Sequence, residues 1–107
     1  MSYTNITPAQ VKAKLDEGIA RLIDVRELQE HAIARIEGAE LMPLSRHPDW
    51  VAILPKDGEL IIMCHHGGRS AQIAEYLTDH LGHANVANMA GGIDAWSTTV
   101  DATVPQY

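Results

Sequence analysis

The residues best suited to chemistry lie between Cys64 and Ser70, where the chain reads Cys-His-His-Gly-Gly-Arg-Ser. Cys64 is the only cysteine, and it follows a run of four apolar residues that predicts a buried strand. Gly67 and Gly68 allow peptide N–H groups to turn toward one point, and Arg69 adds a positive charge. A helix expected from about Ser70 would direct the positive end of its dipole at the same point. The segment therefore predicts an anion-binding loop around the cysteine.

This environment predicts a nucleophilic sulfur. The glycine turn, the helix terminus and Arg69 all favour a thiolate over a thiol, so we expect Cys64 to react near neutral pH. The same groups would stabilise a persulfide anion, in which Cys64 carries a second sulfur atom. A cysteine packed as a small apolar side chain is the alternative, and the neighbouring glycines and arginine disfavour it. We therefore interpret Cys64 as the catalytic residue and the next six residues as the substrate-binding loop: His65, His66, Gly67, Gly68, Arg69 and Ser70.

Two histidines follow the cysteine and raise the question of a metal site. The side chains of three consecutive residues rarely converge on one tetrahedral ion, and the chain has no Cys-x-x-Cys pair. We therefore predict no metal ion at these residues, and no cofactor. Two roles stay open for His65 and His66. They line the mouth of the pocket as donors or proton carriers, or they are solvated loop side chains.

The segments around this loop alternate between strands and helices. Thr7, Pro8 and Gln10 predict a capped helix that ends at Gly18. Apolar runs and helical periodicity predict the other elements: strands at residues 21–25, 39–42, 60–63 and 85–89, helices at 27–34, 49–54 and 70–81, and a turn of helix at 95–96. This alternation predicts an α/β domain with a mostly parallel sheet, in which the carboxyl ends of the strands form the ligand-binding rim. Residues 97–107 show no period and are expected to form an irregular tail.

The composition limits the classes of function. The chain has 107 residues, of which 46% are apolar, and this suits one domain over residues 1–107 with its own core. Its formal net charge of −6 leaves no broad basic field, so we expect neither nucleic acid nor a membrane as a partner. No apolar run approaches the ~20 residues that span a bilayer, and the start lacks the features of a secretory signal. A single cysteine fits a reducing compartment, so the cytoplasm is the expected location.

Four segments, in the same order, resemble the rhodanese family of sulfurtransferases. Each segment alone is a weak match, but four in register cover the chain from about Ile6 to Trp96. The segments are the Cys-x-x-Gly-x-Arg loop at 64–69, Leu22-Ile23-Asp24-Val25-Arg26 with Glu30, Ile36-Glu37-Gly38-Ala39 with Pro43, and Ala90-Gly91-Gly92-Ile93-Asp94-Ala95-Trp96. Members often have a histidine where this chain has Arg35, a difference outside the sulfur chemistry. The resemblance implies a rhodanese-like α/β fold: a five-stranded parallel sheet of order 1-5-4-2-3, with helices on both faces and a first strand near residues 3–6.

The same resemblance implies the transfer of sulfane sulfur from a small anionic donor such as thiosulfate. The acceptor would be cyanide, a thiol or a sulfur-carrier protein. Cys64 would carry the sulfur, the amides of residues 65–70 would cradle it, and Arg69 would bind the donor. Asp24 and Arg26 would support the loop from behind. We expect Arg26 to form an ion pair with Glu30, and Asp24 to reach the loop or accept its hydrogen bonds.

Two other functions compete with this prediction. Phosphatases and arsenate reductases of related architecture resemble Cys-x-x-x-x-x-Arg, whereas here only four residues separate Cys64 from Arg69. The shorter loop makes a tighter cradle, which suits one sulfur atom better than a phosphate group, so we predict no phosphatase activity. The second alternative is a rhodanese module that has lost catalysis and binds a protein partner. Such modules commonly lack the cysteine that this chain keeps.

Overall fold

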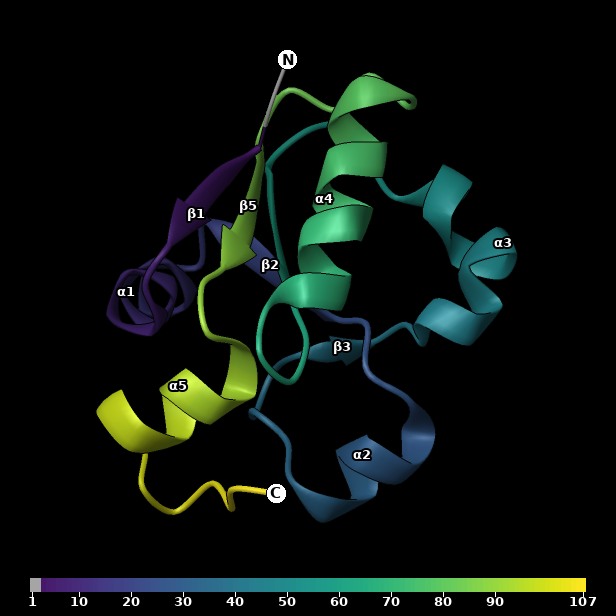
Figure 1. Cartoon of the computed structure of the whole chain (residues 1–107). Coiled ribbons are helices and arrows are strands. Elements are labelled where there is room, and N and C mark those ends of the chain that lie inside the picture. Colours follow the sequence, from purple (N-terminus) through teal and green to yellow (C-terminus); the bar gives the residue numbers. More distant parts are fainter. Residues whose placement is uncertain (1–2) are drawn as a thin grey trace.

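The strands of the computed structural model, which describes residues 3–107, form one five-stranded sheet (Figure 1). They are Thr4–Ile6 (β1), Ala20–Asp24 (β2), Glu40–Leu41 (β3), Glu59–Met63 (β4) and Val86–Met89 (β5). Their order is β1-β5-β4-β2-β3, and every pairing is parallel. The number of strands, their order and their direction confirm the α/β sheet expected from the resemblance.

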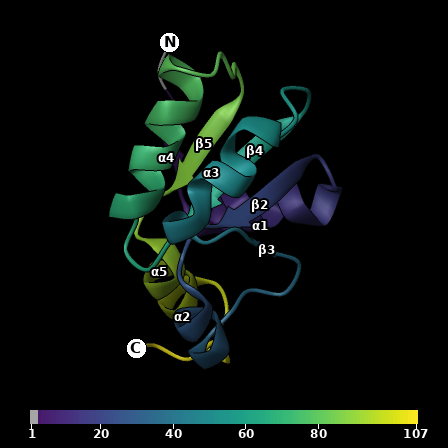
Figure 2. The same cartoon turned by 90° about the vertical axis from the view of Figure 1, so that its right-hand side faces the viewer.

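Helices cover both faces of this sheet (Figure 1 and Figure 2). They are Pro8–Glu17 (α1), Leu28–Ile33 (α2), His47–Trp50 (α3), Gly68–Asp79 (α4) and Gly92–Thr99 (α5), with 3₁₀ turns at Leu44–Arg46 (η1) and Val51–Ile53 (η2). α1 and α5 pack on one face and α3 and α4 on the other, while α2 lies beyond the carboxyl ends of the strands. Within residues 3–107, no helix is long and apolar enough to cross a membrane.

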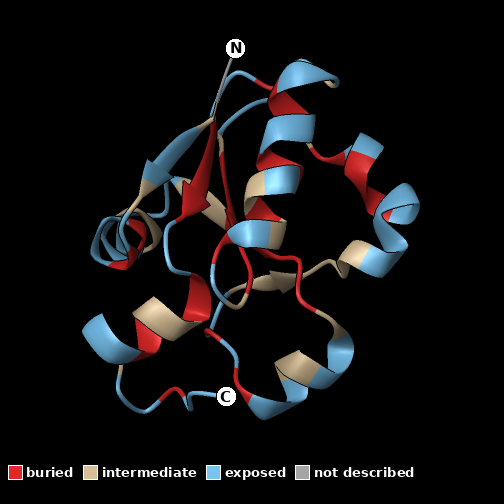
Figure 3. Cartoon of the chain, in the orientation of Figure 1, coloured by how far each residue is buried: buried red, intermediate tan, exposed pale blue. Residues whose placement is uncertain are grey.

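The central strand β4 shows how the two faces acquire separate cores. Alternate side chains of a strand point to opposite faces, and all four residues from Leu60 to Met63 are at most 1% exposed. Leu60 and Ile62 join the core under α3 and α4, whereas Ile61 and Met63 join the core under α1 and α5. Cys64 continues the first set and so lies on the α4 side. Figure 3 shows buried residues gathered along the central strands and on the inner sides of the helices.

The ends of two helices follow local sequence signals. The Gln10 N–H donates to Thr7 Oγ1 over 3.2 Å, and the Thr7 N–H donates to Gln10 Oε1 over 2.8 Å, so the predicted capping box is present. Gly18 ends α1 in the left-handed region, at φ +70°. The helix predicted from residue 70 begins earlier, at Gly68, because Gly67 forms its N-cap at φ +104°.

The expectation of an irregular tail at 97–107 is wrong for its first residues. α5 continues to Thr99, and the chain beyond it is held by packing. Ser97 Oγ donates to the Val104 carbonyl oxygen, and Val104 is buried in the core under α1 and α5. A helix of eight residues has too few turns for its period to be recognised in the sequence. Most other predicted boundaries differ by one or two residues; β3, for example, is only Glu40–Leu41, and α3 begins at His47.

The first turn of α5 packs directly against the loop that follows β4. The Ile93 N–H donates to the Cys64 carbonyl oxygen over 2.9 Å, and the Asp94 N–H donates to that of His65 over 3.1 Å. Gly92 has φ +61°, and a Cβ atom there would lie 2.4 Å from each of these two carbonyl oxygens. This approach therefore requires a glycine at position 92.

Gly92→Ala should destabilise the fold more than Gly18→Ala. Gly18 is the matched control, since its φ is +70° and no heavy atom lies within 4 Å of where its Cβ would be. Both substitutions strain the backbone, but only Gly92→Ala collides with the loop. We expect it to lower the free energy of unfolding by about 1–3 kcal/mol more than Gly18→Ala. Urea unfolding measures the difference, and equal losses would contradict the role of this contact.

Candidate active site

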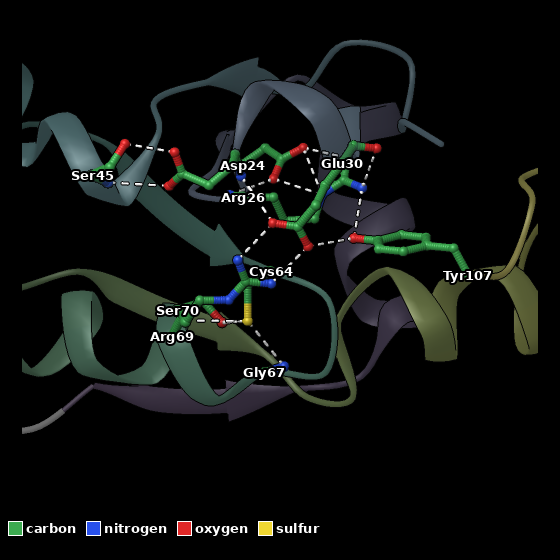
Figure 4. Close-up of polar contacts among 10 residues, drawn as sticks. Asp24, Arg26, Glu30, Ser45, Cys64, Gly67, Arg69, Ser70 and Tyr107 are labelled. Atoms are coloured by element: carbon green, nitrogen blue, oxygen red, sulfur yellow. Dashed lines mark hydrogen bonds and ion pairs between the residues drawn. The ribbon is translucent and has the colours of Figure 1, made fainter. Parts of the chain in front are cut away.

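The Cys64 sulfur accepts hydrogen bonds from the start of α4 (Figure 4). The Gly67 nitrogen lies 3.1 Å from Sγ, the Ser70 nitrogen 3.4 Å and the Ser70 Oγ 3.3 Å. Of the six amides expected to cradle the sulfur, those of Gly67 and Ser70 donate to Sγ itself. Cys64 is 1% exposed and follows the carboxyl end of β4. The arrangement is an anion-binding turn closed around a sulfur atom.

Asn88 of β5 fixes the inner side of the loop. Its Nδ2 donates to the Gly67 carbonyl oxygen over 3.3 Å, and its Oδ1 accepts from Ser70 Oγ over 2.6 Å. The Ser70 hydroxyl has a single hydrogen, so it donates either to Asn88 or to Cys64, and the contact with Asn88 is shorter. A negative charge on the sulfur would draw that hydrogen toward Sγ. Asn88 is absent from the sequence prediction, although a polar side chain in the buried run Val-Ala-Asn-Met was a usable signal.

Arg69 is paired with a carboxylate and is not a free charge. Its Nη1 and Nη2 donate to the two carboxylate oxygens of Glu30, which belongs to α2, over 2.7 and 2.9 Å (Figure 4). These hydrogen bonds hold the pKa of Glu30 at about 2, well below its ordinary value, and the same pair raises the pKa of Arg69. Glu30 does not occupy the Nε–H group or the second hydrogens of Nη1 and Nη2. Arg69 can therefore still donate to an anion.

The expected ion pair between Arg26 and Glu30 is wrong, because each side chain pairs elsewhere. Arg26 is fully buried, with its Nη2 2.7 Å from Asp24 Oδ2 and its Nε 2.9 Å from Asp24 Oδ1. It reaches Glu30 only through Nη1, which donates to the backbone carbonyl oxygen over 3.3 Å. The physical reason is the turn after β2, where Asp24 Oδ1 also accepts from the Arg26 N–H over 3.0 Å. That turn directs Arg26 inward, against Asp24.

Asp24 and Arg26 form a buried ion pair that contacts α2 through the Glu30 carbonyl oxygen. Both side chains are 0% exposed, so neither faces solvent from which a substrate would arrive. Loss of one partner would leave a buried charge uncompensated, which typically costs about 3–5 kcal/mol. Their support of the site is therefore indirect, through the position of Glu30.

Tyr107, from the segment expected to be irregular, reaches the same cluster. Its hydroxyl donates to Glu30 Oε2 over 2.9 Å and accepts from Arg26 Nη1 over 3.1 Å (Figure 4). Its ring stacks on that of His65 with centroids 3.9 Å apart and planes inclined by 8°. His65 stacks in turn on His66, also at 3.9 Å. No local pattern in the sequence indicates this contact, because it joins segments far apart in the chain.

The remaining loop residues differ in their exposure. His66 is exposed and His65 is half-buried, so imidazole rings form part of the outer side of the loop. Gly68 begins α4, and no heavy atom lies within 4 Å of where its Cβ would be. At Gly67, by contrast, a Cβ would lie 3.3 Å from the Gly91 nitrogen. The left-handed backbone at position 67, with φ +104°, therefore favours a glycine there and a Cβ would press on Gly91, whereas position 68 has neither constraint.

Comparison with known proteins identifies the family of this fold and loop. Residues 7–99 match the model of the rhodanese-like domain family. The chain belongs to this family. The match includes the loop after Cys64, the helix that carries Glu30 and the first turn of α5.

Two relatives of this rhodanese-like chain differ in length. The rhodanese-like/PpiC domain-containing protein 12, chloroplastic, of Arabidopsis thaliana is 39% identical over 92 residues, which cover 82% of this chain. This chain spans only 30% of that relative's length. The thiosulfate sulfurtransferase GlpE of Pseudomonas fluorescens is 29% identical over 104 residues, which cover 97% of this chain and 94% of the relative.

Solved structures agree with the family assignment. A rhodanese-related protein from Thermoplasma volcanium superimposes with a TM-score of 0.81 at 30% identity, covering 92% of this chain and 94% of that one. The human single-domain sulfurtransferase TSTD1 superimposes with a TM-score of 0.76 at 26% identity, covering 92% of this chain and 98% of that one.

The ion pair between Glu30 and Arg69 should make stability depend on pH in the acid range. The pKa of Glu30 is lowered in the folded chain, so the stabilisation is fully present above about 4.5 and is lost as the pH falls toward about 2. Glu30→Gln should therefore lower the free energy of unfolding at neutral pH by about 1–2 kcal/mol, allowing for solvent screening. The difference from the wild type should shrink over that acid range.

Urea unfolding of both proteins, repeated as the pH is lowered, measures this change. Glu75→Gln on the exposed side of α4 is the control, since Glu75 forms no ion pair among residues 3–107. A difference between wild type and Glu30→Gln that stays constant into acid would contradict the assignment.

Proposed function

We propose that this chain is a sulfurtransferase that carries sulfane sulfur as a persulfide on Cys64. One observation carries the proposal: the Gly67 amide, the Ser70 amide and the Ser70 hydroxyl converge on one sulfur at 3.1 to 3.4 Å. The two amides are fixed in advance and would stabilise a sulfur anion without reorganisation, while the Ser70 hydrogen would turn from Asn88 to the sulfur. Relatives named thiosulfate sulfurtransferase support thiosulfate as the donor.

Loading requires one exchange of S–S bonds. The Cys64 thiolate attacks the outer sulfur of thiosulfate, the S–S bond of thiosulfate breaks, and sulfite leaves with the electron pair. The product is a persulfide anion whose outer sulfur stands about 2 Å beyond Sγ. In the second step the acceptor attacks that outer sulfur and the Cys64 thiolate departs. Cyanide becomes thiocyanate, a thiol becomes a persulfide, and a sulfur-carrier protein would receive the sulfur by the same attack.

Arg69 is the group proposed to bind the anionic donor. Its side chain is 35% exposed, and its hydrogens that are not bonded to Glu30 can meet the sulfonate oxygens of thiosulfate. Arg69 could therefore bind the donor while its other two donors stay paired with Glu30. Because Cys64 is only 1% exposed, the donor can reach Sγ only when groups at the mouth move.

The burial of Cys64 also favours a second candidate function. In a module that only binds a protein partner, the sulfur would be a packing group, and it does belong to the core under α3 and α4. A phosphatase has no comparable support, because only four residues separate Cys64 from Arg69. The persulfide chemistry needs no cofactor, and a reducing compartment such as the cytoplasm would keep Cys64 available.

Incubation of the reduced chain with thiosulfate should add one sulfur atom, about 32 Da, to Cys64, and dithiothreitol should remove it. Intact-mass spectrometry measures the adduct, and thiocyanate formation from cyanide measures turnover. Cys64→Ser should abolish both, because an alcohol oxygen does not form an exchangeable bond to sulfane sulfur. If neither thiosulfate nor an organic persulfide adds sulfur, and thiocyanate stays at the level of Cys64→Ala, the proposal is wrong. Binding of a protein partner would then be the better-supported function.

Arg69→Ala should raise the KM for thiosulfate about ten-fold or more, which corresponds to the loss of one charge-assisted hydrogen bond. Loading from an uncharged persulfide donor should fall less, because that donor has no anionic group to bind. Arg46→Ala is the matched control, since Arg46 is an exposed arginine of η1 paired with Asp49. Equal losses with both donors would remove the anion-binding role of Arg69.

A further inference from the structure

Two histidines of the loop and an aspartate of α5 lie together on the outer side of the candidate site. One ring nitrogen of His65, one of His66 and a carboxylate oxygen of Asp94 lie within 4.8 Å of one another. The backbone hydrogen bond from the Asp94 N–H to the His65 carbonyl oxygen brings the aspartate there. The Cys64 sulfur is not one of these atoms, so the cluster is distinct from the sulfur cradle.

One residue of the cluster, His65, carries a buried ring nitrogen, Nε2, without a hydrogen-bond partner in the described part of the chain. Such atoms are rare in folded proteins and point to a ligand or a water. The His65 ring is stacked between the rings of Tyr107 and His66, and these two contacts hold its orientation. Gln106 Nε2 donates to Asp94 Oδ1 over 3.1 Å, and it orients the carboxylate as outer partners orient the ligands of a metal ion.

We propose that His65, His66 and Asp94 bind a divalent transition-metal ion, with Zn²⁺ as the best match. Two imidazole nitrogens and one carboxylate oxygen form a ligand set typical of zinc with water in the fourth position. Ligand atoms on a tetrahedral zinc ion lie about 3.4 Å apart. An imidazole nitrogen binds a metal ion in the plane of its ring, so the exposed His66 ring must turn out of its stack on His65 to complete the set from separations of at most 4.8 Å. The prediction of no metal rested on the consecutive residues 64–66 and did not consider Asp94, which comes from α5.

A metal ion bound here would act on the proposed sulfur transfer without taking part in it. His65 and His66 belong to the loop that forms the cradle, and Asp94 belongs to the helix that packs against it. A bound ion would tie the loop to α5 and narrow the way to a sulfur that is already only 1% exposed. Zinc should therefore inhibit sulfur transfer.

Zinc binding can be measured apart from sulfur chemistry in Cys64→Ser, which removes the thiolate and keeps the three proposed ligands. Calorimetric titration of this variant with Zn²⁺ should show one site per chain. Adding Asp94→Asn or His66→Ala should weaken the affinity about ten-fold or more. Asp57→Asn and His80→Ala, at exposed residues of the same types, should leave it unchanged. Circular dichroism establishes that each variant is folded.

Two results would overturn the proposal. One is the loss of zinc binding in Cys64→Ser alone, because the thiolate would then be the essential ligand. The other is equal affinity with and without Asp94→Asn in a folded chain. Co²⁺ bound to the wild type provides an independent measurement. The proposal expects visible absorption typical of nitrogen and oxygen ligands, and a sulfur-to-metal charge-transfer band would contradict it.

Inhibition links the site to the activity. Zinc should inhibit sulfur transfer by the wild type, and Asp94→Asn should raise the zinc concentration for half-inhibition about ten-fold or more. Unchanged inhibition in Asp94→Asn would contradict the inhibitory role. The binding titration does not depend on sulfur transfer, so failure of the proposed activity and failure of the metal site would be seen separately.

Discussion

The loop after β4 keeps its shape because the N-termini of two helices hold it from two sides. On one side, the first turn of α5 donates to the carbonyl oxygens of Cys64 and His65 over 2.9 and 3.1 Å. A peptide group is planar and trans, so the N–H that follows each carbonyl points the opposite way, away from α5. On the other side, the start of α4 donates to Sγ from Gly67 and Ser70. Backbone hydrogen bonds therefore organise the loop before any substrate arrives.

The charge at this site is local and already compensated. The chain carries a formal net charge of −6, so attraction of an anion must come from the site itself. The guanidinium of Arg69 is shared with Glu30, and the buried pair of Asp24 and Arg26 is neutral as a unit. A small anion therefore meets fixed N–H dipoles and one arginine that it shares with Glu30. Such a site favours a compact anion that can use both over a large, highly charged one.

Local patterns in the sequence predict the elements of this fold well. The capping box at Thr7 and Gln10 and the apolar run of β4 depend on neighbours in the chain, and both are present in the structure. The loop residues could also be predicted, because Cys64 and the glycines after it are contiguous. Sequence patterns in this chain therefore encode which segments turn and which form strands and helices.

Contacts between distant segments could not be predicted in the same way. Arg26 has Asp24 two positions before it and Glu30 four positions after it. Only the direction of the turn after β2 decides which of the two carboxylates it pairs with. Tyr107 and Asp94 reach the loop because α5 packs where it does, which no periodicity encodes. Asn88 differs, since a polar residue in a buried strand must find partners and so indicates a contact without naming it.

The small size of the loop after β4 bears on both of its proposed roles, in sulfur transfer and in metal binding. The Gly67 and Ser70 nitrogens lie 3.1 and 3.4 Å from Sγ, so these amides are engaged with the cysteine sulfur itself. A phosphate group needs donors around several oxygens, whereas a persulfide adds only one atom about 2 Å beyond Sγ. A loop this short is therefore matched in size to one added sulfur. Because its backbone is occupied on both sides, the rings of His65 and His66 are left on its outer side, and there they meet Asp94.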